Sequence, residues 1–198
     1  GQYTSLGVVL PDGARQLRQY SLLDGAYEQT TSCYRVAVER SGEVSEFLHN
    51  HVAVGDTIQA TLAAGDLILT DGDNPVVLLS QGIGSTPMVG MLSYLAAQRS
   101  QRQVIVVHAD ASEAESAQKS EMERLVEQLP NARLELYFRD QGERVDAPAI
   151  IPAGASVYLC GGVRFLQSVR DQIDAIPADQ APADVHFELF SPNDWLIN

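Results

Sequence analysis

The chain has 198 residues, of which 45% are hydrophobic and 20% charged, and its formal net charge is −13. This composition is typical of a soluble globular protein with one or two domains. The negative charge argues against nucleic acid or an anionic membrane surface as a partner, and no apolar run approaches the length of a membrane span. Cys33 and Cys160 lie far apart and form no disulfide framework, so a reducing cytoplasm is the expected setting.

The first 72 residues predict short β-strands separated by turns, with one helix among them. The expected strands span residues 6–10, 18–23, 32–39, 57–61 and 66–70, and the expected helix spans residues 44–52. Turn sequences such as Pro11-Asp12-Gly13 and Ala64-Gly65-Asp66 stand between them. This pattern predicts a small antiparallel barrel with a single helix.

One barrel strand contains Arg18-Gln19-Tyr20-Ser21. An arginine fork suits a phosphate, a tyrosine offers a flat face, and a serine hydroxyl can reach a ring nitrogen, so the set fits a flavin nucleotide. On these four residues alone, an ordinary strand with alternating exposed side chains is the simpler interpretation.

A glycine turn, Gly42-Glu43-Val44-Ser45, leads into the expected helix of the barrel half. The free N–H groups of a helix start face outward and can bind an anion. The alternative interpretation is a plain helix entry with Ser45 near the N-cap. In that helix, His49 and His51 have no third histidine or cysteine nearby, so no metal site is expected.

Residues 71–75 form a turn-rich link, after which strand and helix patterns alternate. The expected strands span residues 76–80, 104–108, 133–138, 157–160 and 186–190, and the expected helices span residues 87–98, 112–128 and 164–176. Such alternation predicts a doubly wound parallel sheet. We therefore expect two domains, residues 1–72 and residues 73–198.

The sequence Gln81-Gly82-Ile83-Gly84-Ser85-Thr86-Pro87 joins the first strand of this half to its first helix. Glycines let phosphate oxygens approach the backbone, and the N–H groups at the helix start face the anion. Pro87 suits a first helical turn, where no N–H is needed. The pattern predicts a pyrophosphate cradle, with a purely structural tight turn as the alternative.

Two later segments are expected to reach the same edge of the sheet. Cys160 and Gly161 follow a strand and open the last long helix, so the thiol would line a nicotinamide pocket unless it is simply a buried apolar cysteine. In the final strand Glu188 and Phe190 share one face, so Phe190 would cover a flavin ring, or else close the core as an ordinary phenylalanine.

In this order, these segments resemble the ferredoxin–NADP reductase superfamily, and within it the reductase module of flavohaemoglobins. The resemblance covers nearly the whole chain, and the ordered combination is specific although each motif alone is common. It implies an antiparallel FAD-binding barrel in residues 1–72, followed by a doubly wound parallel-sheet NAD(P)-binding domain in residues 73–198. The resembling segments are Gly1-Gln2-Tyr3, residues 18–21, 42–51, 54–56, 64–66, 82–88, 108–109, 158–161 and 187–192.

The resemblance also implies roles for individual residues. Those expected to bind FAD are Tyr3, Arg18, Gln19, Tyr20, Ser21, Gly42, Glu43, Val44 and Ser45. Those expected to hold the dinucleotide are Gly82, Ile83, Gly84, Ser85, Thr86, Pro87, Cys160 and Gly161. Those expected to close over the flavin are Leu189, Phe190, Ser191 and Pro192. Ser21, Tyr20, Cys160, Glu188 and Phe190 would surround the reacting rings, with Glu188 on the flavin–haem side.

The sequence departs from the family pattern at two positions and in its extent. Gly162 stands where the family has proline, and Ser191 where it has glycine. The family's barrel begins with a further strand before Gly1, and flavohaemoglobins carry a globin domain before that. We therefore expect an N-terminally incomplete barrel, with one exposed edge and weak FAD retention, in a chain that does not itself bind haem.

The implied activity is an FAD-dependent NAD(P)H oxidoreductase that passes electrons to a haem, as in a flavohaemoglobin nitric oxide dioxygenase. NADH is expected over NADPH, because Asp110, Glu113 and Glu115 follow the second strand of the sheet with only Lys119 nearby. The acceptor would be a haem-globin domain or another one-electron carrier. Alternatives are a reductase serving an iron–sulfur protein or oxygenase, and a degenerate fold kept as a binding module.

Overall fold

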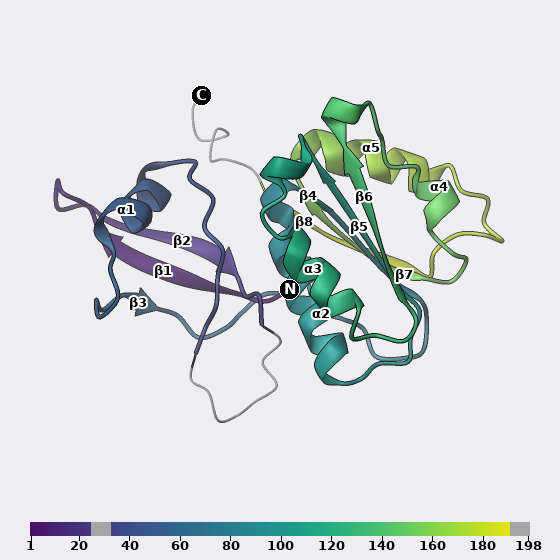
Figure 1. Cartoon of the computed structure of the whole chain (residues 1–198), viewed down its shortest axis with the longest axis horizontal. Coiled ribbons are helices and arrows are strands. Elements are labelled where there is room, and N and C mark those ends of the chain that lie inside the picture. The colour runs from purple at the N-terminus through teal and green to yellow at the C-terminus, as the bar shows by residue number, and fades with distance from the viewer. Residues whose placement is uncertain (25–32, 191–198) are drawn as a thin grey trace.

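The computed structural model describes residues 1–24 and 33–190 and has two halves joined side by side (Figure 1). A three-stranded antiparallel sheet of order β2-β1-β3 forms the first half, and a five-stranded parallel sheet of order β6-β5-β4-β7-β8 forms the second. This confirms the predicted fold class. Among the described residues, no helix is both long enough and apolar enough to cross a membrane.

The first half consists of β1 (Tyr3–Val9), β2 (Arg15–Ser21), α1 (Glu43–His51) and β3 (Gln59–Ala60). Helix α1 packs on one face of the sheet, where Val44 joins Val8 and Leu10 in a small core. Because β1 lies between β2 and β3, β2 has one unpaired edge among the described residues. The last residues of β2 point toward the second half (Figure 1).

The second half alternates strands and helices from β4 to β8. Its strands are β4 (Val76–Gln81), β5 (Val104–Asp110), β6 (Ala132–Phe138), β7 (Ser156–Gly161) and β8 (Asp184–Leu189). Its α-helices are α2 (Ser85–Ala97), α3 (Lys119–Val126), α4 (Ala147–Ile150) and α5 (Val163–Asp174). Three 3₁₀ turns, η1 (Gly82–Gly84), η2 (Glu113–Glu115) and η3 (Arg139–Gln141), complete it.

Helices cover both faces of the parallel sheet, which explains the continuous apolar strands. Helices α2 and α3 cover one face, and α4 and α5 cover the other (Figure 1). The first five residues of β4 and all six of β7 are buried, as expected for strands that are covered on both sides.

Helix α2 lies between the parallel sheet and the first half, and ten of its thirteen residues are buried. On one side it packs on β4 and β7, and on the other Gly90 meets the backbone of Leu22 just after β2, where a Cβ would come within 2.3 Å of the Leu22 carbonyl oxygen. A helix that is apolar all round is buried, and this one forms the join between the two halves.

Two predicted strands are absent, and one predicted helix is shorter. Residues 33–39 form only an isolated bridge, between Val36 and Leu22, while residue 32 lies outside the described part of the chain. Residues 66–70 form no strand. Both segments instead pack apolar side chains, including Ala37 and Leu67, on the core around α2. The expected helix at 112–128 is divided, because the backbone leaves the helical region at Ser116 (φ −76°, ψ 76°).

Candidate functional site

A cavity of about 250 Å³ opens at the carboxyl edge of the parallel sheet. In the strand order β6-β5-β4-β7-β8, the chain winds outward in opposite directions from β4 and β7. Doubly wound sheets bind ligands at this point, outside the carboxyl ends of the strands. The residues that line the cavity are Glu39, Gln81, Gly82, Ile83, Gly84, Asp110, Ala111, Arg139, Gly162 and Phe190.

The turn after β4 has the geometry of an anion cradle. Gly82 has φ +53°, and a Cβ there would meet no heavy atom of the described residues within 4 Å, so in this part of the structure its backbone is open to the cavity. Gly84 lies against β7, where a Cβ would come within 2.6 Å of the Cys160 carbonyl oxygen. The 3₁₀ turn η1 leads directly into α2, and the Ser85 N–H donates to the Gly82 carbonyl oxygen. The N–H groups that lack a partner within this helical start are therefore those of Gly82, Ile83 and Gly84, and they can bind a phosphate.

The residues that follow the glycines shape this turn from behind. Ser85, Thr86 and Pro87 are all buried, and the Thr86 hydroxyl donates to the Ile83 carbonyl oxygen at 2.9 Å. Helix α2 begins at Ser85, two residues earlier than the predicted start at Pro87. Proline still stands in the first turn, where its missing N–H costs no hydrogen bond.

Cys160 and Glu188 are paired in register on β7 and β8, and neither is among the residues that line the cavity. Cys160 is fully buried, and burial raises the pKa of its thiol far above the ordinary value, so the thiol is protonated at neutral pH. Burial also raises the pKa of Glu188, and its Oε2 has no hydrogen-bond partner among the described residues. An unpartnered buried oxygen of this kind is costly, which is typical of functional sites.

The end of β8 supplies an aromatic ring to the cavity. Phe190 lines it and donates its backbone N–H to the Gly161 carbonyl oxygen at 3.0 Å, while Leu189 is 48% exposed. A Cβ on Gly161 would come within 2.9 Å of the Phe165 ring, so the β7 turn also depends on glycine. Ser191 and Pro192 lie outside the described residues.

In the first half of the chain, the predicted site residues lie on both faces of the antiparallel sheet. Arg18 and Tyr20 lie on the same face of the sheet as Val8, which is the face that α1 covers. Tyr3, Gln19 and Ser21 lie on the opposite face by the same register. Burial raises the pKa of Tyr20, and Arg18 opposes this shift.

The Gly42–Ser45 turn is stabilised by its own serine. The Ser45 hydroxyl accepts from the backbone N–H groups of Ser41 and Gly42, both at 2.9 Å, and donates to the Gly42 carbonyl oxygen at 2.8 Å. Val44 is buried in the small core, whereas Glu43 is exposed. The hydroxyl of Ser45 is thus committed to the helix start, and the remaining first-turn N–H groups of α1 stay available.

The cavity also contains charged residues that the motifs do not mark. Arg139 follows β6, and Glu39 comes from the first half of the chain. The Asp140 N–H donates to the Ala111 carbonyl oxygen at 3.0 Å, which fixes the end of β6 beside the end of β5. Because the carboxyl ends of parallel strands meet at one edge of a sheet, the position of Arg139 at this cavity could have been predicted from the sequence. The position of Glu39 there depends on how the two halves pack.

A larger cavity, of about 400 Å³, lies between the first half and α2. It is lined by residues such as Leu22, Tyr94 and Arg102 and reaches Thr70, just before the parallel sheet begins. Arg102 and Thr70 mark the amino ends of the strands, whereas the glycine turns stand at the carboxyl ends. The smaller cavity is therefore the candidate site.

Comparisons with known proteins agree with this geometry. Residues 78–171 match the oxidoreductase NAD-binding domain family. The flavohemoprotein of Deinococcus radiodurans is 36% identical over 213 residues, covering 98% of this chain and 51% of the relative. The chain spans about half the length of the curated relatives it matches.

Solved structures indicate the same similarity to flavohemoproteins. The flavohem-like FAD/NAD-binding domain of nitric oxide dioxygenase from Vibrio cholerae is 32% identical with a TM-score of 0.85, covering 96% of this chain and 84% of that one. The flavohemoglobin of Malassezia yamatoensis, solved with bound FAD and heme, is 30% identical with a TM-score of 0.81, covering 96% of this chain and 51% of that one. The chain therefore belongs to the flavohaemoglobin reductase modules of the ferredoxin–NADP reductase superfamily.

Proposed function

We propose that this chain is an FAD-dependent NADH oxidoreductase that delivers electrons to a haem. Residues 1–72 hold FAD, and residues 73–198 bind the pyridine nucleotide. The observation that carries this proposal is the cavity at the carboxyl edge of the sheet, where the open turn of Gly82 meets the ring of Phe190. A phosphate cradle and an aromatic cover in one cavity suit a dinucleotide with a flat reactive ring.

The residues present fit both groups. Gly82 leaves backbone open for a pyrophosphate, and Glu188 has a buried oxygen without a partner beside the proposed ring site. When bound, NADH supplies a hydride to the flavin, and the flavin passes electrons singly to the acceptor. The work of the protein is to bind both groups, align them and exclude water.

In the nucleotide half, the backbone of Gly82, Ile83 and Gly84 binds the pyrophosphate. Cys160 and Gly161 flank the nicotinamide, and a protonated, buried thiol offers a small neutral wall there. Behind the turn, Ser85, Thr86 and Pro87 hold its shape. Phe190 covers the flavin together with Leu189, with Glu188 beneath it.

In the FAD half, Arg18 binds a phosphate of FAD from the same face as Tyr20 and α1. Tyr20 stacks on the flavin system. Tyr3, Gln19 and Ser21, whose side chains lie on the opposite face, contribute from the same end of the sheet. The residues of the α1 turn, Gly42, Glu43, Val44 and Ser45, complete the phosphate site. The backbone N–H groups of that turn are the binding atoms, because Ser45 uses its hydroxyl within the turn.

NADH is the preferred nucleotide in this proposal. Among the described residues that line the cavity, Glu39 and Asp110 are acidic and Arg139 is basic. A 2′-phosphate needs a local excess of positive charge, which this cavity lacks. Comparing flavin reduction rates with NADH and NADPH tests the preference, and a clear advantage for NADPH contradicts it.

The proposed electron acceptor is inferred from the relatives. The curated relatives are named flavohemoproteins, and one solved relative contains FAD and heme. We propose a haem-globin domain as the acceptor, with nitric oxide dioxygenase as the activity of the joined protein. The cytoplasm is the proposed location, since Cys33 and Cys160 are both free thiols in the described structure.

The decisive experiment is anaerobic reduction of the FAD-saturated chain. We expect a yellow protein whose flavin absorbance bleaches on mixing with NADH. Delivery of electrons to a haem-globin, and not to a [2Fe–2S] ferredoxin, supports the haem route over a reductase for iron–sulfur proteins. A folded, FAD-saturated chain that neither NADH nor NADPH reduces would overturn the proposal.

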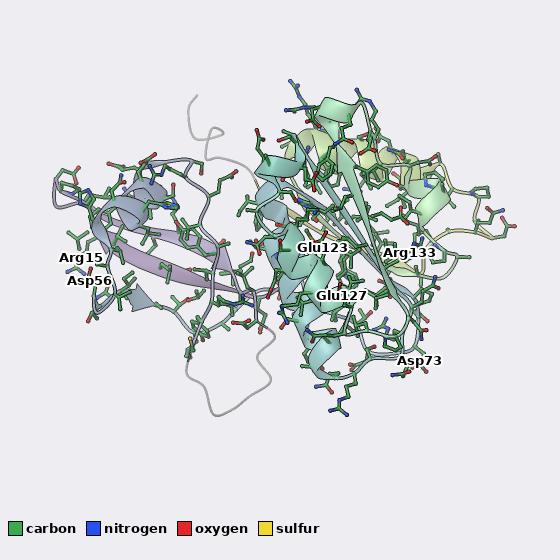
Figure 2. The ribbon with its side chains drawn as sticks, viewed as in Figure 1. Arg15, Asp56, Asp73, Glu123, Glu127 and Arg133 are labelled. Carbon is green, nitrogen blue, oxygen red and sulfur yellow. The ribbon has the colours of Figure 1, made fainter. Side chains whose placement is uncertain are left out.

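A matched pair of variants tests the FAD half. Arg18→Ala should weaken FAD binding by about tenfold or more, because a charge-assisted hydrogen bond to phosphate is lost. Arg15→Ala removes the same group from the opposite face of β2, at the end of the strand far from the second half, and should bind FAD normally (Figure 2). Equal losses in both variants would contradict the assignment of Arg18.

A further inference from the structure

Three buried polar side chains form a hydrogen-bonded chain beside the cavity. The Ser80 Oγ lies 2.9 Å from the His108 Nδ1, and the His108 Nε2 lies 3.3 Å from the Asp110 Oδ2. Ser80 and His108 are at most 1% exposed, and the Asp110 side chain is 12% exposed. Ser80 and His108 are paired in register on β4 and β5, so the chain crosses from one strand to the next.

The partners define the protonation of the imidazole. A carboxylate can only accept hydrogen bonds, so the proton of neutral His108 stands on Nε2, facing Asp110. The Nδ1 atom then accepts from the Ser80 hydroxyl, which has a rotatable proton. Burial lowers the pKa of His108, with Asp110 acting against this shift, and this favours the neutral ring. All three groups are thereby satisfied in one arrangement.

The carboxylate of Asp110 is held at both oxygens and still faces the cavity. Its Oδ1 accepts from the Ala111 N–H at 2.8 Å, and its Oδ2 accepts from His108. Each oxygen keeps a second lone pair, and Asp110 lines the cavity together with Gly82 and Gly84. Asp110 is also the last residue of β5, the second strand of the doubly wound half. An acidic residue there can accept hydrogen bonds from the ribose hydroxyls of a dinucleotide.

We infer that His108 is a positioning residue, and that the Ser80–His108–Asp110 chain selects a nucleotide ribose with a free 2′-hydroxyl. This inference rests on the proposed binding of a pyridine nucleotide and names the residues that set its selectivity. Asp110 contacts the ribose diol, and His108 acts through Asp110. A 2′-phosphate would meet a fixed negative charge at the same place.

Arg139 gives the inference a second consequence. In the part of the cavity lining that the structure describes, Arg139 is the basic residue, beside the acidic Glu39 and Asp110. Its position next to the end of β5 follows from the hydrogen bond between Asp140 and Ala111. When Asp110 is neutralised, Arg139 becomes available to a 2′-phosphate. Asp110→Asn should therefore tighten NADP⁺ binding, and adding Arg139→Gln should cancel that gain.

The test measures calorimetric dissociation constants of NAD⁺ and NADP⁺ for the FAD-saturated chain. Neither oxidised nucleotide can reduce the flavin, so the readout is independent of activity. The wild type should bind NAD⁺ about tenfold or more tighter than NADP⁺, and His108→Leu should remove most of that ratio. His108→Gln keeps an amide N–H donor toward Asp110 and should retain it.

The controls separate positioning from a general structural role. Asp73→Asn makes the same charge change as Asp110→Asn at an exposed site before β4, at the opposite end of the sheet (Figure 2), and should leave the ratio unchanged. Ser80→Ala, a milder change than His108→Leu, should lower the ratio partially. Loss of affinity for both nucleotides by the same factor in His108→Leu and Ser80→Ala would overturn the inference.

The two proposals fail in different ways. A chain that selects NAD⁺ over NADP⁺ but is not reduced by NADH contradicts the proposed function and leaves the selectivity assignment intact. A chain that NADH reduces, but whose nucleotide ratio does not respond to His108→Leu, contradicts only the positioning role.

Discussion

The turn after β4 is packed directly on β7, because a Cβ on Gly84 would stand 2.6 Å from the Cys160 carbonyl oxygen. This contact fixes the separation of the two glycine turns at the carboxyl edge. Gly84→Ala should lower the free energy of unfolding by about 1–3 kcal/mol, since backbone must move to admit the methyl group. It should also weaken NAD⁺ binding, as measured by calorimetry alongside urea unfolding.

Gly82→Ala is the matched comparison for the loss of stability. Its Cβ would contact none of the described residues within 4 Å, so the cost is conformational, from φ +53°. That cost is about 1–2 kcal/mol for a residue with a Cβ. If Gly84→Ala binds NAD⁺ as tightly as the wild type does, close packing of the two turns is not what shapes the site.

The start of α1 depends on one hydroxyl. Ser45→Ala removes the acceptor for two backbone N–H groups, those of Ser41 and Gly42, and should cost about 0.5–2 kcal/mol of stability. Thermal unfolding followed by circular dichroism measures this loss. Ser41→Ala changes an exposed hydroxyl in the same turn and should be close to neutral. Equal melting temperatures for both variants would contradict the role of Ser45.

The strands and helices of the parallel half could largely be predicted from the sequence, because local patterns and tertiary environment agree there. The apolar runs of β4 and β7 reflect burial on both faces, and the glycine turn between β4 and α2 follows from its spacing. The first half was less predictable. Residues 33–39 and 66–70 alternate like strands, but their apolar side chains pack on α2 and the core beneath it instead of lining a barrel.

Some residues of the candidate site could likewise be predicted from the sequence, and others could not. The residues of the Gly82–Gly84 turn and Phe190 were recognised from sequence, and the structure brings them to one cavity. Glu39 reaches that cavity only through the packing of the two halves. The link from Ser80 through His108 to Asp110 joins neighbouring strands, so it exists only once their register is known.

Gly162 tests how far the family pattern applies to this chain. The family has proline here, and the observed φ of −73° is one that proline adopts, with an extended residue before it. Within the residues that the structure describes, a Cβ here would meet the end of the Gln81 side chain, at 3.6 Å, and nothing nearer. Gly162→Pro should therefore raise the free energy of unfolding by about 0.4–1 kcal/mol, by restricting the unfolded chain.

The comparison for this variant is Gly161→Ala at the neighbouring position. There a Cβ would come within 2.9 Å of the Phe165 ring, so the substitution should destabilise the protein. Urea unfolding of both variants gives the two signs directly. A destabilised Gly162→Pro protein would mean that the N–H of Gly162 has a role in the native state that the family's proline lacks.

The buried imidazole of His108 should make stability depend on pH. Burial lowers its pKa below the ordinary value of 6.5, and Asp110 opposes this shift. Below pH 6.5 the unfolded chain therefore binds a proton that the native state does not, so this contribution to stability is lost as the pH falls from that value toward the native pKa. In His108→Gln the contribution is absent. Between about pH 7.5 and about pH 5.5, the wild type should lose more unfolding free energy than the variant. Urea unfolding at both pH values measures the difference, and parallel losses would show that His108 titrates alike in the folded and unfolded chain.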